Sequence, residues 1–304
     1  MSQQILFFPV NNYIGEIAAL SAALLWAISS IIYGRLGLKI SPLKLNLYKG
    51  IMAIAFIALT LVVRGTAFTG ISLRTIALLS VSGVIGIGLG DTAYFSALNS
   101  LGARRTLLLE TASPPMGALL ALILIGERLT PLAWCGILLT ILGIAWVISE
   151  RNPLNQKRAS RQGVVWGMLA AISQAVGSVI SRFALVQSDI SPLESALIRL
   201  LGGTVIVIGL LLLSAATKQS AAKITLSVRS LGIIAIAALG STYLGIWLQQ
   251  TSLKFAPTGI AQTFLATSPL FVLPIVALEG EKITWRSILG VGISLSGIAL
   301  MFIR

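Results

Sequence analysis

The chain has 304 residues, of which 56% are hydrophobic and only 10% are charged, and its formal net charge is +13 at pH 7. Soluble domains are about 45–50% apolar and about 25% charged, and disordered chains are poorer still in apolar residues, so both classes are excluded. The length allows roughly ten membrane crossings of about 20 residues each, joined by short loops, which predicts a multi-pass membrane protein.

Two residue types that commonly carry out chemistry in proteins are scarce in this chain. There is no histidine, the usual general base and metal ligand, and Cys135 is the only cysteine. A disulfide framework and thiolate metal clusters are therefore excluded, and most hydrolytic intramembrane enzymes would lack their catalytic groups. We expect no metal and no cofactor. The 22 basic residues are scattered between apolar runs, which favours contact with lipid head groups over binding of nucleic acid.

Apolar runs separated by polar breaks predict ten transmembrane helices. Taken in chain order, they span residues 13–34, 44–64, 75–99, 102–125, 130–149, 162–186, 192–215, 229–252, 257–278 and 284–303. The most polar stretch of the chain, residues 150–161, lies between the fifth and sixth helices and predicts a linker. We therefore expect a first domain of five helices at 1–149 and a second at 162–304.

The second half of the chain repeats motifs of the first in the same order. The segment 126–130, GERLT, recurs as GEKIT at 280–284, and a Ser-Pro-Leu motif opens both the second and the seventh helix, which aligns Lys49 with Arg199. Because each half has an odd number of helices, the second half must enter the membrane from the opposite face. Inverted repeats of this kind are typical of secondary transporters, whose substrate site lies near the midplane between the halves.

Two prolines share the offset that separates those repeated segments. Pro115 and Pro269 lie near the middle of the fourth and ninth helices, where a missing N–H must free backbone carbonyls. We expect a kink at each, which serves either a gating movement or a static bend. Glycines at seven-residue spacing in the fifth and tenth helices predict close helix packing: Gly136, Gly143, Gly290 and Gly297.

These repeated motifs resemble the EamA family of the drug/metabolite transporter superfamily. The GERL-type block followed by a glycine-spaced last helix occurs twice, and residues 91–98, DTAYFSAL, followed by Gly102-Ala103 and Pro115, are similar to a common variant of the family's third and fourth helices. The resemblance covers nearly the whole chain. It implies a transporter of the bacterial inner membrane that exports small metabolites such as amino acids, or toxic compounds.

Two acids lie inside predicted helices, whereas the other seven lie at helix ends or in loops. Asp91 in the third helix and Glu110 in the fourth are similarly far from the turn that joins these antiparallel helices, so both should lie at a similar depth. A charge near the bilayer centre costs at least about 2.5–3.5 kcal/mol. The counterparts of these acids in the second half, Ile246 and Phe264, are apolar, which argues against a purely architectural role.

We interpret Asp91 and Glu110 as groups that couple transport to protons or that bind a cationic group of the substrate. The alternative is a structural ion pair, in which Arg104 or Arg105, less than two turns away from Glu110, neutralises that acid. The two interpretations differ in where the basic partner lies, in the substrate or in the protein.

Polar and aromatic side chains recur at helical spacing on several of the predicted helices. In lipid such groups need partners inside the protein, and a cavity between helices one, three, four, six, eight and nine would provide them. The residues that we place in this cavity are Trp26, Ser30, Tyr33, Asp91, Tyr94, Thr106, Glu110, Gln174, Ser178, Tyr243, Trp247, Gln250 and Gln262. The alternative for single serines and threonines is a hydrogen bond to the backbone of their own helix.

These features predict an all-α secondary transporter that exports a small polar or amphipathic metabolite by alternating access. Amino acids are the leading substrate class by family resemblance, protons are the candidate coupling ion, and the oligomeric state stays open. An exporter of drugs is the nearest rival; a non-transporting membrane scaffold and an intramembrane lipid enzyme are rivals from other classes. Most basic residues lie in loops opposite the termini, which places the termini outside, whereas the resemblance implies termini inside, so the orientation also stays open.

Overall fold

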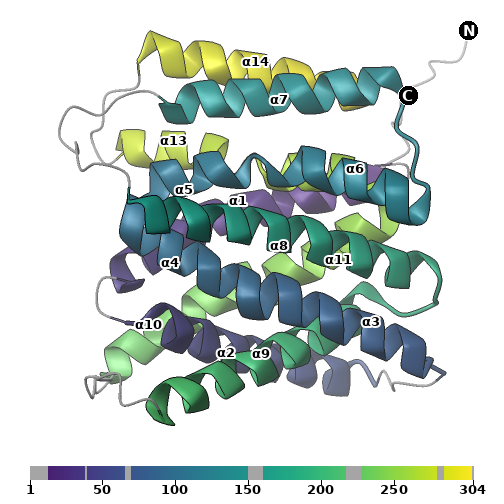
Figure 1. Ribbon diagram of the computed structural model, residues 1–304, viewed down its shortest axis with the longest axis vertical. Helices are drawn as coiled ribbons and strands as arrows, with labels where there is room; N and C mark the ends of the chain where they lie inside the picture. The colour runs from purple at the N-terminus through teal and green to yellow at the C-terminus, as the bar shows by residue number, and fades with distance from the viewer. Residues whose placement is uncertain are drawn as a thin grey trace, which may run out of the picture.

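The computed structural model describes residues 13–37, 40–65, 70–149, 160–216, 227–278 and 284–302, and these residues form helices joined by short turns, with no strand among them. Nine helical segments in these ranges are long and apolar enough to cross a membrane, and Pro131–Val147 is a shorter apolar helix. The protein is therefore an all-α, ten-helix membrane protein, whose helices run side by side in Figure 1. Of the predicted linker, residues 150–159 lie outside the described residues.

Four of the ten crossings consist of more than one helical segment. In chain order the crossings are α1 (Ile14–Gly37); α2 (Pro42–Val63); α3 (Leu73–Gly83), η2 (Val84–Gly90) and α4 (Asp91–Leu101); α5 (Ala103–Glu110) and α6 (Ser113–Ile125); α7 (Pro131–Ser149); α8 (Arg161–Val186); α9 (Pro192–Ala216); α10 (Val228–Ala238), η3 (Leu239–Leu244) and α11 (Gly245–Phe255); α12 (Thr258–Leu265) and α13 (Ser268–Leu278); and α14 (Trp285–Phe302). The ten predicted helices are confirmed, with ends displaced by three residues at most.

The first and last described residues lie on the same face of the molecule. The rings of Tyr13 and Phe302 are in contact, with centroids 5.2 Å apart. An even number of crossings requires this arrangement. We call this side the terminal face; the turns after α2, α6, α8 and α11 lie on it as well, because successive crossings alternate in direction.

The fourth and ninth crossings are each interrupted shortly before their proline, four residues ahead of it in the fourth and two residues ahead of it in the ninth. The helix breaks at Thr111 before Pro115 and at Thr267 before Pro269. Proline has no N–H to donate, so the carbonyls of the preceding turn lose their partners and the helix cannot continue unbroken. At each break the threonine hydroxyl donates to a backbone carbonyl three residues earlier, at 2.6 Å in both cases. The kinks expected at the two prolines thus take the form of short breaks.

The third and eighth crossings contain π-helical segments, η2 and η3, at corresponding places in the two halves. A π-helix pairs each N–H with the carbonyl five residues back, so it rotates the side chains that follow relative to a regular helix. In η2 a side chain supports this irregular backbone: the Asn46 amide donates to the carbonyl of Ile87 at 2.9 Å and to Thr92 Oγ1 at 3.0 Å. The side chain of Asp91 comes directly after this segment.

A run of glycines lets the third crossing approach α8 and α9 closely. A Cβ atom on Gly83 would lie 1.9 Å from the Arg199 carbonyl oxygen, and one on Gly88 would lie 2.1 Å from a methyl carbon of Ile206. A side chain at Gly83 would have to move the backbone of α9, and one at Gly88 would have to displace the Ile206 side chain. The run, which includes Gly86 and Gly90, is therefore a packing surface that fixes α9 against η2.

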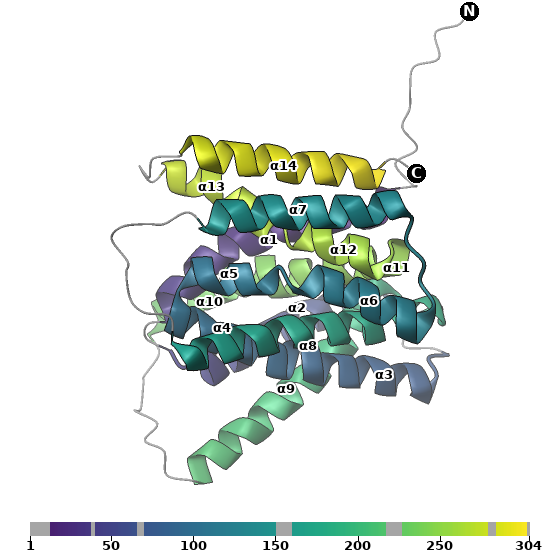
Figure 2. The ribbon, with the colours of Figure 1, turned by 45° about the horizontal axis from the view of Figure 1, so that its top comes forward.

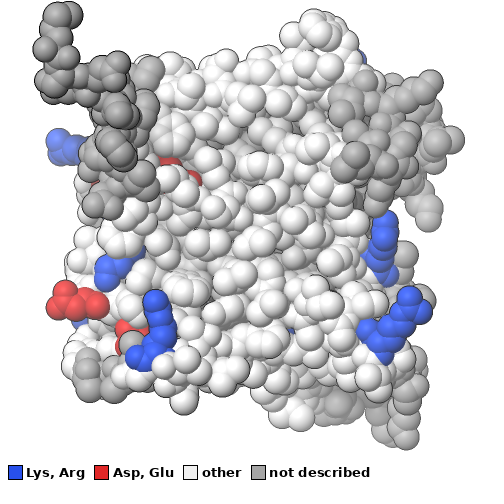
Figure 3. Space-filling view, turned by 180° about the vertical axis from the view of Figure 1, so that it is seen from behind, with Lys and Arg blue, Asp and Glu red and all other residues white. Residues whose placement is uncertain are grey.

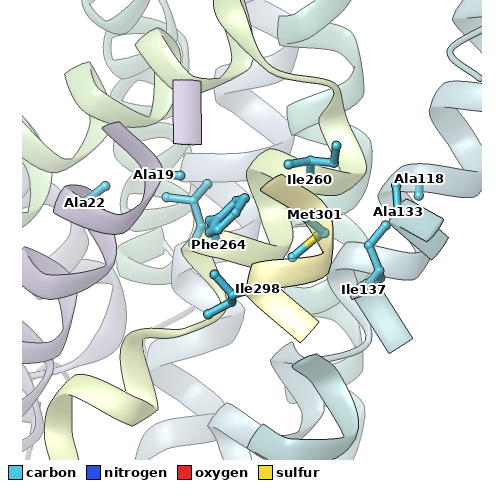
Figure 4. Close-up of a cluster of buried hydrophobic side chains, with 10 residues drawn as sticks. Ala19, Ala22, Ala118, Ala133, Ile137, Ile260, Phe264, Ile298 and Met301 are labelled. Carbon is cyan, nitrogen blue, oxygen red and sulfur yellow. The ribbon is translucent and has the colours of Figure 1, made fainter. Parts of the chain in front are cut away.

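The fifth and tenth crossings, α7 and α14, form a pair at one edge of the molecule (Figures 1 and 2). A Cβ atom on Gly143 would lie 2.6 Å from the Gly290 carbonyl oxygen, and one on Gly297 would lie 2.7 Å from the Gly136 carbonyl oxygen. The close packing predicted from the two glycine pairs is confirmed. Figure 4 shows the apolar cluster between this pair and α1, α6 and α12, with Phe264 and Met301 at its centre.

Charged side chains lie toward the ends of the helices on the face shown in Figure 3, and the broad band between them is uncharged. Large apolar side chains such as Val63, Ile123 and Leu212 are more than 60% exposed within the chain itself. In a soluble protein such exposure would be unfavourable, but these side chains suit contact with lipid tails.

Candidate substrate cavity

A cavity of about 190 Å³ lies between the two halves, and its described walls come from every crossing except α7 and α14. At roughly 15 Å³ for each water-sized site, it has room for about a dozen water molecules, which suits a small metabolite. The wall combines apolar and aromatic side chains with a few charged groups, the usual composition of a small-molecule site.

Most of the residues predicted for the cavity lie on its wall. They are Trp26, Ser30, Tyr33, Asp91, Tyr94, Glu110, Gln174 and Gln262. Pro269 lies on the wall as well, and the two acids from neighbouring helices thus face one common space.

The other predicted residues lie away from the cavity. The Thr106 hydroxyl donates to the Gly102 carbonyl of its own helix at 2.9 Å, which is the alternative expected for a single threonine. Gln250 is fully buried between α8 and α9, where it accepts hydrogen bonds from Ser181 and Ser195. Ser178 is buried as well, and its hydroxyl has no hydrogen-bond partner among the described residues.

Tyr243 and Trp247 face α2 instead of the cavity. The Tyr243 hydroxyl lies 2.8 Å from Thr60 Oγ1, and the Trp247 ring lies beneath the Arg64 guanidinium. The cavity side of the eighth crossing is formed by the residues one position earlier than the predicted stripe: Thr242, Ile246 and Gln249. Both sets of residues have the same helical spacing, so the prediction chose the neighbouring face of the helix: Tyr243 and Trp247 turn toward α2, and the residues before them line the cavity.

The charged centre of the cavity is an ion pair between Lys49 of α2 and Asp91 of α4. Lys49 is 5% exposed, and its ammonium also lies over the Phe95 ring, 5.3 Å from the ring centroid. Asp91 begins α4 directly after η2, so the π-helical segment sets the direction of its carboxylate. Asp91 therefore already has a counter-ion within the protein.

Glu110 is the second acid on the wall and has a different environment. It is the last residue of α5, directly before the break in the fourth crossing, and it makes no hydrogen bond or ion pair with the described residues. Arg105 has an exposed side chain, and the side chain of Arg104 lies outside the described part of the chain. Among described residues, then, the proposed neutralising partner is not in contact with Glu110.

Arg199 of α9 is a cavity residue that we did not single out from the sequence. It is 1% exposed, and its Nη1 atom donates to Gln249 Oε1 at a long 3.4 Å, while Nε has no partner among the described residues. The signal that could have found it is its alignment with Lys49: two bases at equivalent positions, each inside an apolar helix, mark a buried cationic pair.

Three hydrogen bonds between the halves fix the rest of the wall. The Trp26 indole N–H donates to the Ser241 carbonyl at 2.8 Å, and the Tyr33 hydroxyl lies 3.0 Å from Ser241 Oγ. Across the cavity, the Ser113 hydroxyl donates to Gln262 Oε1 at 2.7 Å, which leaves Gln262 Nε2 without a partner in the described structure. Both halves thus contribute polar groups to one site.

A separate ionic network joins the halves near the terminal face. Glu127 accepts a hydrogen bond from Arg182 Nε at 2.6 Å and another from the Thr258 N–H at 2.8 Å. Arg182 Nη1 in turn donates to the carbonyls of Leu253 and Lys254, each at 2.8 Å. Glu127 therefore caps α12, a helix of the other half, and not the helix that follows it in the chain.

Known proteins with similar sequences or folds agree with this architecture. The sequence profile of the EamA-like transporter family matches residues 13–149 and again residues 161–303. A protein of Archaeoglobus fulgidus described as an uncharacterized transporter is 26% identical over 290 residues, which are 94% of this chain and 96% of that protein. A protein of known crystal structure shares the fold, with a TM-score of 0.73, 16% identity and coverage of 96% of both chains.

Proposed function

Because this chain belongs to the EamA-like transporter family, it is a membrane transporter, and we propose that it exports a small zwitterionic metabolite, an amino acid, by alternating access. The setting expected for this activity is the inner membrane of a bacterial-type cell. The substrate would occupy the cavity between the halves, and Glu110 would bind its ammonium group or carry a coupling proton.

The charge balance of the cavity carries this proposal. Two acids, Asp91 and Glu110, and two bases, Lys49 and Arg199, line its described wall, so the formal charges sum to zero. A net-neutral site that presents both signs of charge suits a molecule with a positive and a negative group. A cationic drug would instead leave the wall with a surplus of positive charge in a medium of low dielectric constant.

Two features support alternating access. The crossings that line the cavity include the broken helices α5–α6 and α12–α13 and the two π-helical segments, which are the places where a helix bends at the lowest cost. The network around Glu127 and Arg182 holds α8, α11 and α12 together between the cavity and the terminal face. We propose that the halves rock about the cavity, with this network intact in one state and broken in the other.

The function can be tested without choosing a substrate in advance. Bacteria that express the wild type, a Glu110→Gln variant or no transporter would be compared at matched membrane levels, and the small molecules in the medium would be profiled. Asp189→Asn is the matched control, since it converts an exposed acid on the terminal face to its amide. We expect one or more amino acids to accumulate outside with the wild type and with Asp189→Asn, but not with Glu110→Gln.

Each other outcome of this experiment has a defined meaning. Accumulation of chemically unrelated cations would favour the drug exporter. Accumulation that is equal for the wild type and Glu110→Gln would leave transport standing and remove Glu110 from the site. If the wild type matched cells without the transporter, export of metabolites would be refuted, and a scaffold would become the better account.

A further inference from the structure

We infer that Arg199 is the anchor for the carboxylate of the substrate, so that the amino acid is held with its carboxylate toward α9 and its ammonium group toward Glu110 of α5. This inference rests on the proposed function and adds a residue and an orientation to it. The two poles of the substrate would then contact different halves of the protein.

The first argument is that Arg199 is a buried cation without a counter-ion in contact. A guanidinium has five N–H donors in a planar fork that matches a carboxylate. In the described structure the only hydrogen bond of this guanidinium is the long one to Gln249, and its Nε is buried and unpartnered. An unpaired charge in the membrane interior is costly, so a site of this kind is expected to receive an anionic group.

The second argument is that the other charges of the cavity are arranged around this one. Lys49 and Asp91 form an ion pair with each other and therefore have little capacity for a ligand. Glu110 makes no contact of this kind with described residues, and it lies on α5 on the side of the cavity away from the terminal face. The wall thus presents one available negative group and one available positive group, so a zwitterionic substrate should bind in one orientation.

The third argument is that the fold holds the guanidinium in place. A Cβ atom on Gly86 would lie 3.0 Å from Arg199 Nη2, and the backbone of α9 is pressed against Gly83. The glycine run of η2 therefore leaves just enough room for the guanidinium at the cavity wall. A rigidly positioned donor pair is what selectivity for a planar carboxylate requires.

The test separates the two poles of the substrate by ligand chemistry. Thermal stability of the purified full-length protein in detergent would be measured against each of the twenty protein amino acids, because a ligand that binds the folded state raises the unfolding temperature. The amide and the N-acetyl derivative of the tightest binder follow; the amide lacks the carboxylate and the N-acetyl derivative lacks the ammonium group. These probes avoid any need to follow membrane permeation.

For the wild type we expect both derivatives to bind about tenfold to a hundredfold more weakly than the amino acid, the effect of losing a hydrogen bond between charged groups. In Arg199→Gln the preference over the amide should fall to within about threefold, while the preference over the N-acetyl derivative persists. Glu110→Gln should show the reverse pattern. Arg229→Gln, which removes an exposed cation, is the matched control and should behave like the wild type.

A second pair of variants keeps the test decisive if Arg199→Gln does not fold. Gly86→Ala places a methyl group against the guanidinium and leaves its charge in the protein. Gly240→Ala makes the same change in η3, where the nearest atom would lie at an ordinary contact distance of 3.6 Å. We expect Gly86→Ala to reduce the preference for the amino acid over its amide and Gly240→Ala to leave it unchanged.

The inference would be overturned if Arg199→Gln kept the full preference over the amide, or if the two glycine variants behaved alike. It would also be overturned if the wild type bound the amide as tightly as the amino acid, although export of amino acids would then still stand. A wild type that is stabilised by none of the twenty amino acids would refute the proposed function, and the assignment of Arg199 with it.

Discussion

In the first half of the protein, η2 is followed by Asp91, and α5 ends on Glu110; at the corresponding positions of the second half lie Ile246 and Phe264, which are 5% and 0% exposed. The same irregular helices thus carry acids at these positions in one half and apolar side chains in the other. The comparison teaches that the repeat specifies where helices bend, whereas the chemistry of the site comes from residues that break the repeat.

The two bases of the cavity also differ between the halves, in the partner that each of them contacts. Lys49 and Arg199 occupy equivalent positions, and both reach the cavity wall. Lys49 is paired with Asp91, whereas Arg199 contacts the neutral side chain of Gln249. One cation is therefore neutralised within the protein and the other is available to a ligand. The following changes test this contrast between equivalent positions.

The largest effect is expected from Asp91→Asn, compared with Ile246→Val at the equivalent position. Asp91→Asn should lower the free energy of unfolding by about 3 kcal/mol, because it leaves the buried Lys49 without its counter-ion. Ile246→Val removes one methylene and should cost about 1 kcal/mol. Denaturation in detergent measures both. Equal losses would contradict the view that the Lys49–Asp91 pair is a structural element of the first half.

Glu110→Gln and Phe264→Leu should have opposite effects on transport and on stability. Glu110→Gln should reduce transport at least about tenfold while stability stays the same or rises, because no described residue is bonded to this acid. Phe264→Leu should lower the free energy of unfolding by about 1 kcal/mol with transport preserved, because Phe264 is fully buried in the cluster of Figure 4. Transport assays and unfolding curves of the same samples decide between this account and one in which both positions are simple packing.

Glu127→Gln should open the terminal face. In a Cys135→Ala background the chain has no other cysteine, so a reporter at the buried Ser252, beside the carbonyls that Arg182 binds, can be labelled selectively. Removing the charge of Glu127 weakens its bond to Arg182 by about 1 kcal/mol, so labelling of Ser252→Cys by a hydrophilic maleimide should rise roughly fivefold. An unchanged labelling rate would show that the network does not hold this face closed.

The smallest effects are expected for the affinity of amino-acid binding, when a tryptophan on the cavity wall is compared with one that was predicted there but faces α2. Trp26→Phe removes a wall residue and its hydrogen bond to Ser241, and it should weaken amino-acid binding about threefold to tenfold. Trp247→Phe alters a ring that faces α2 and should change the affinity less than about twofold. The thermal-shift titration measures both. A larger loss of affinity for Trp247→Phe than for Trp26→Phe would instead support the sequence prediction that Trp247 lies on the cavity wall.

The sequence was sufficient to predict the ten crossings and the shared position of Asp91 and Glu110. Hydropathy marks the helices because lipid tolerates few charges, and simple counting along two antiparallel helices brings the acids together. The prolines at 115 and 269 also pointed to the interrupted helices. These predictions need only local composition and helical geometry.

The missed features depend on contacts between distant segments. Two stripes of the same helical spacing run along the eighth crossing, and only the contacts with α2 decide that Tyr243 and Trp247 face away from the cavity while Thr242 and Ile246 line it. In the sequence, Arg199 stands out only through its alignment with Lys49. Its burial depends on the close approach of α9 to the glycine run of η2, which a sequence alone does not reveal.

The most direct test of the central claim is exchange of amino acids across a membrane by the purified protein. Liposomes that contain the wild type would be loaded with a mixture of unlabelled amino acids, and entry of each labelled amino acid would be followed, with Glu110→Gln at the same protein density as the comparison. The account predicts that at least one labelled amino acid accumulates transiently with the wild type and not with Glu110→Gln. Absence of exchange for all amino acids, by wild-type protein that retains its native unfolding transition, would contradict it.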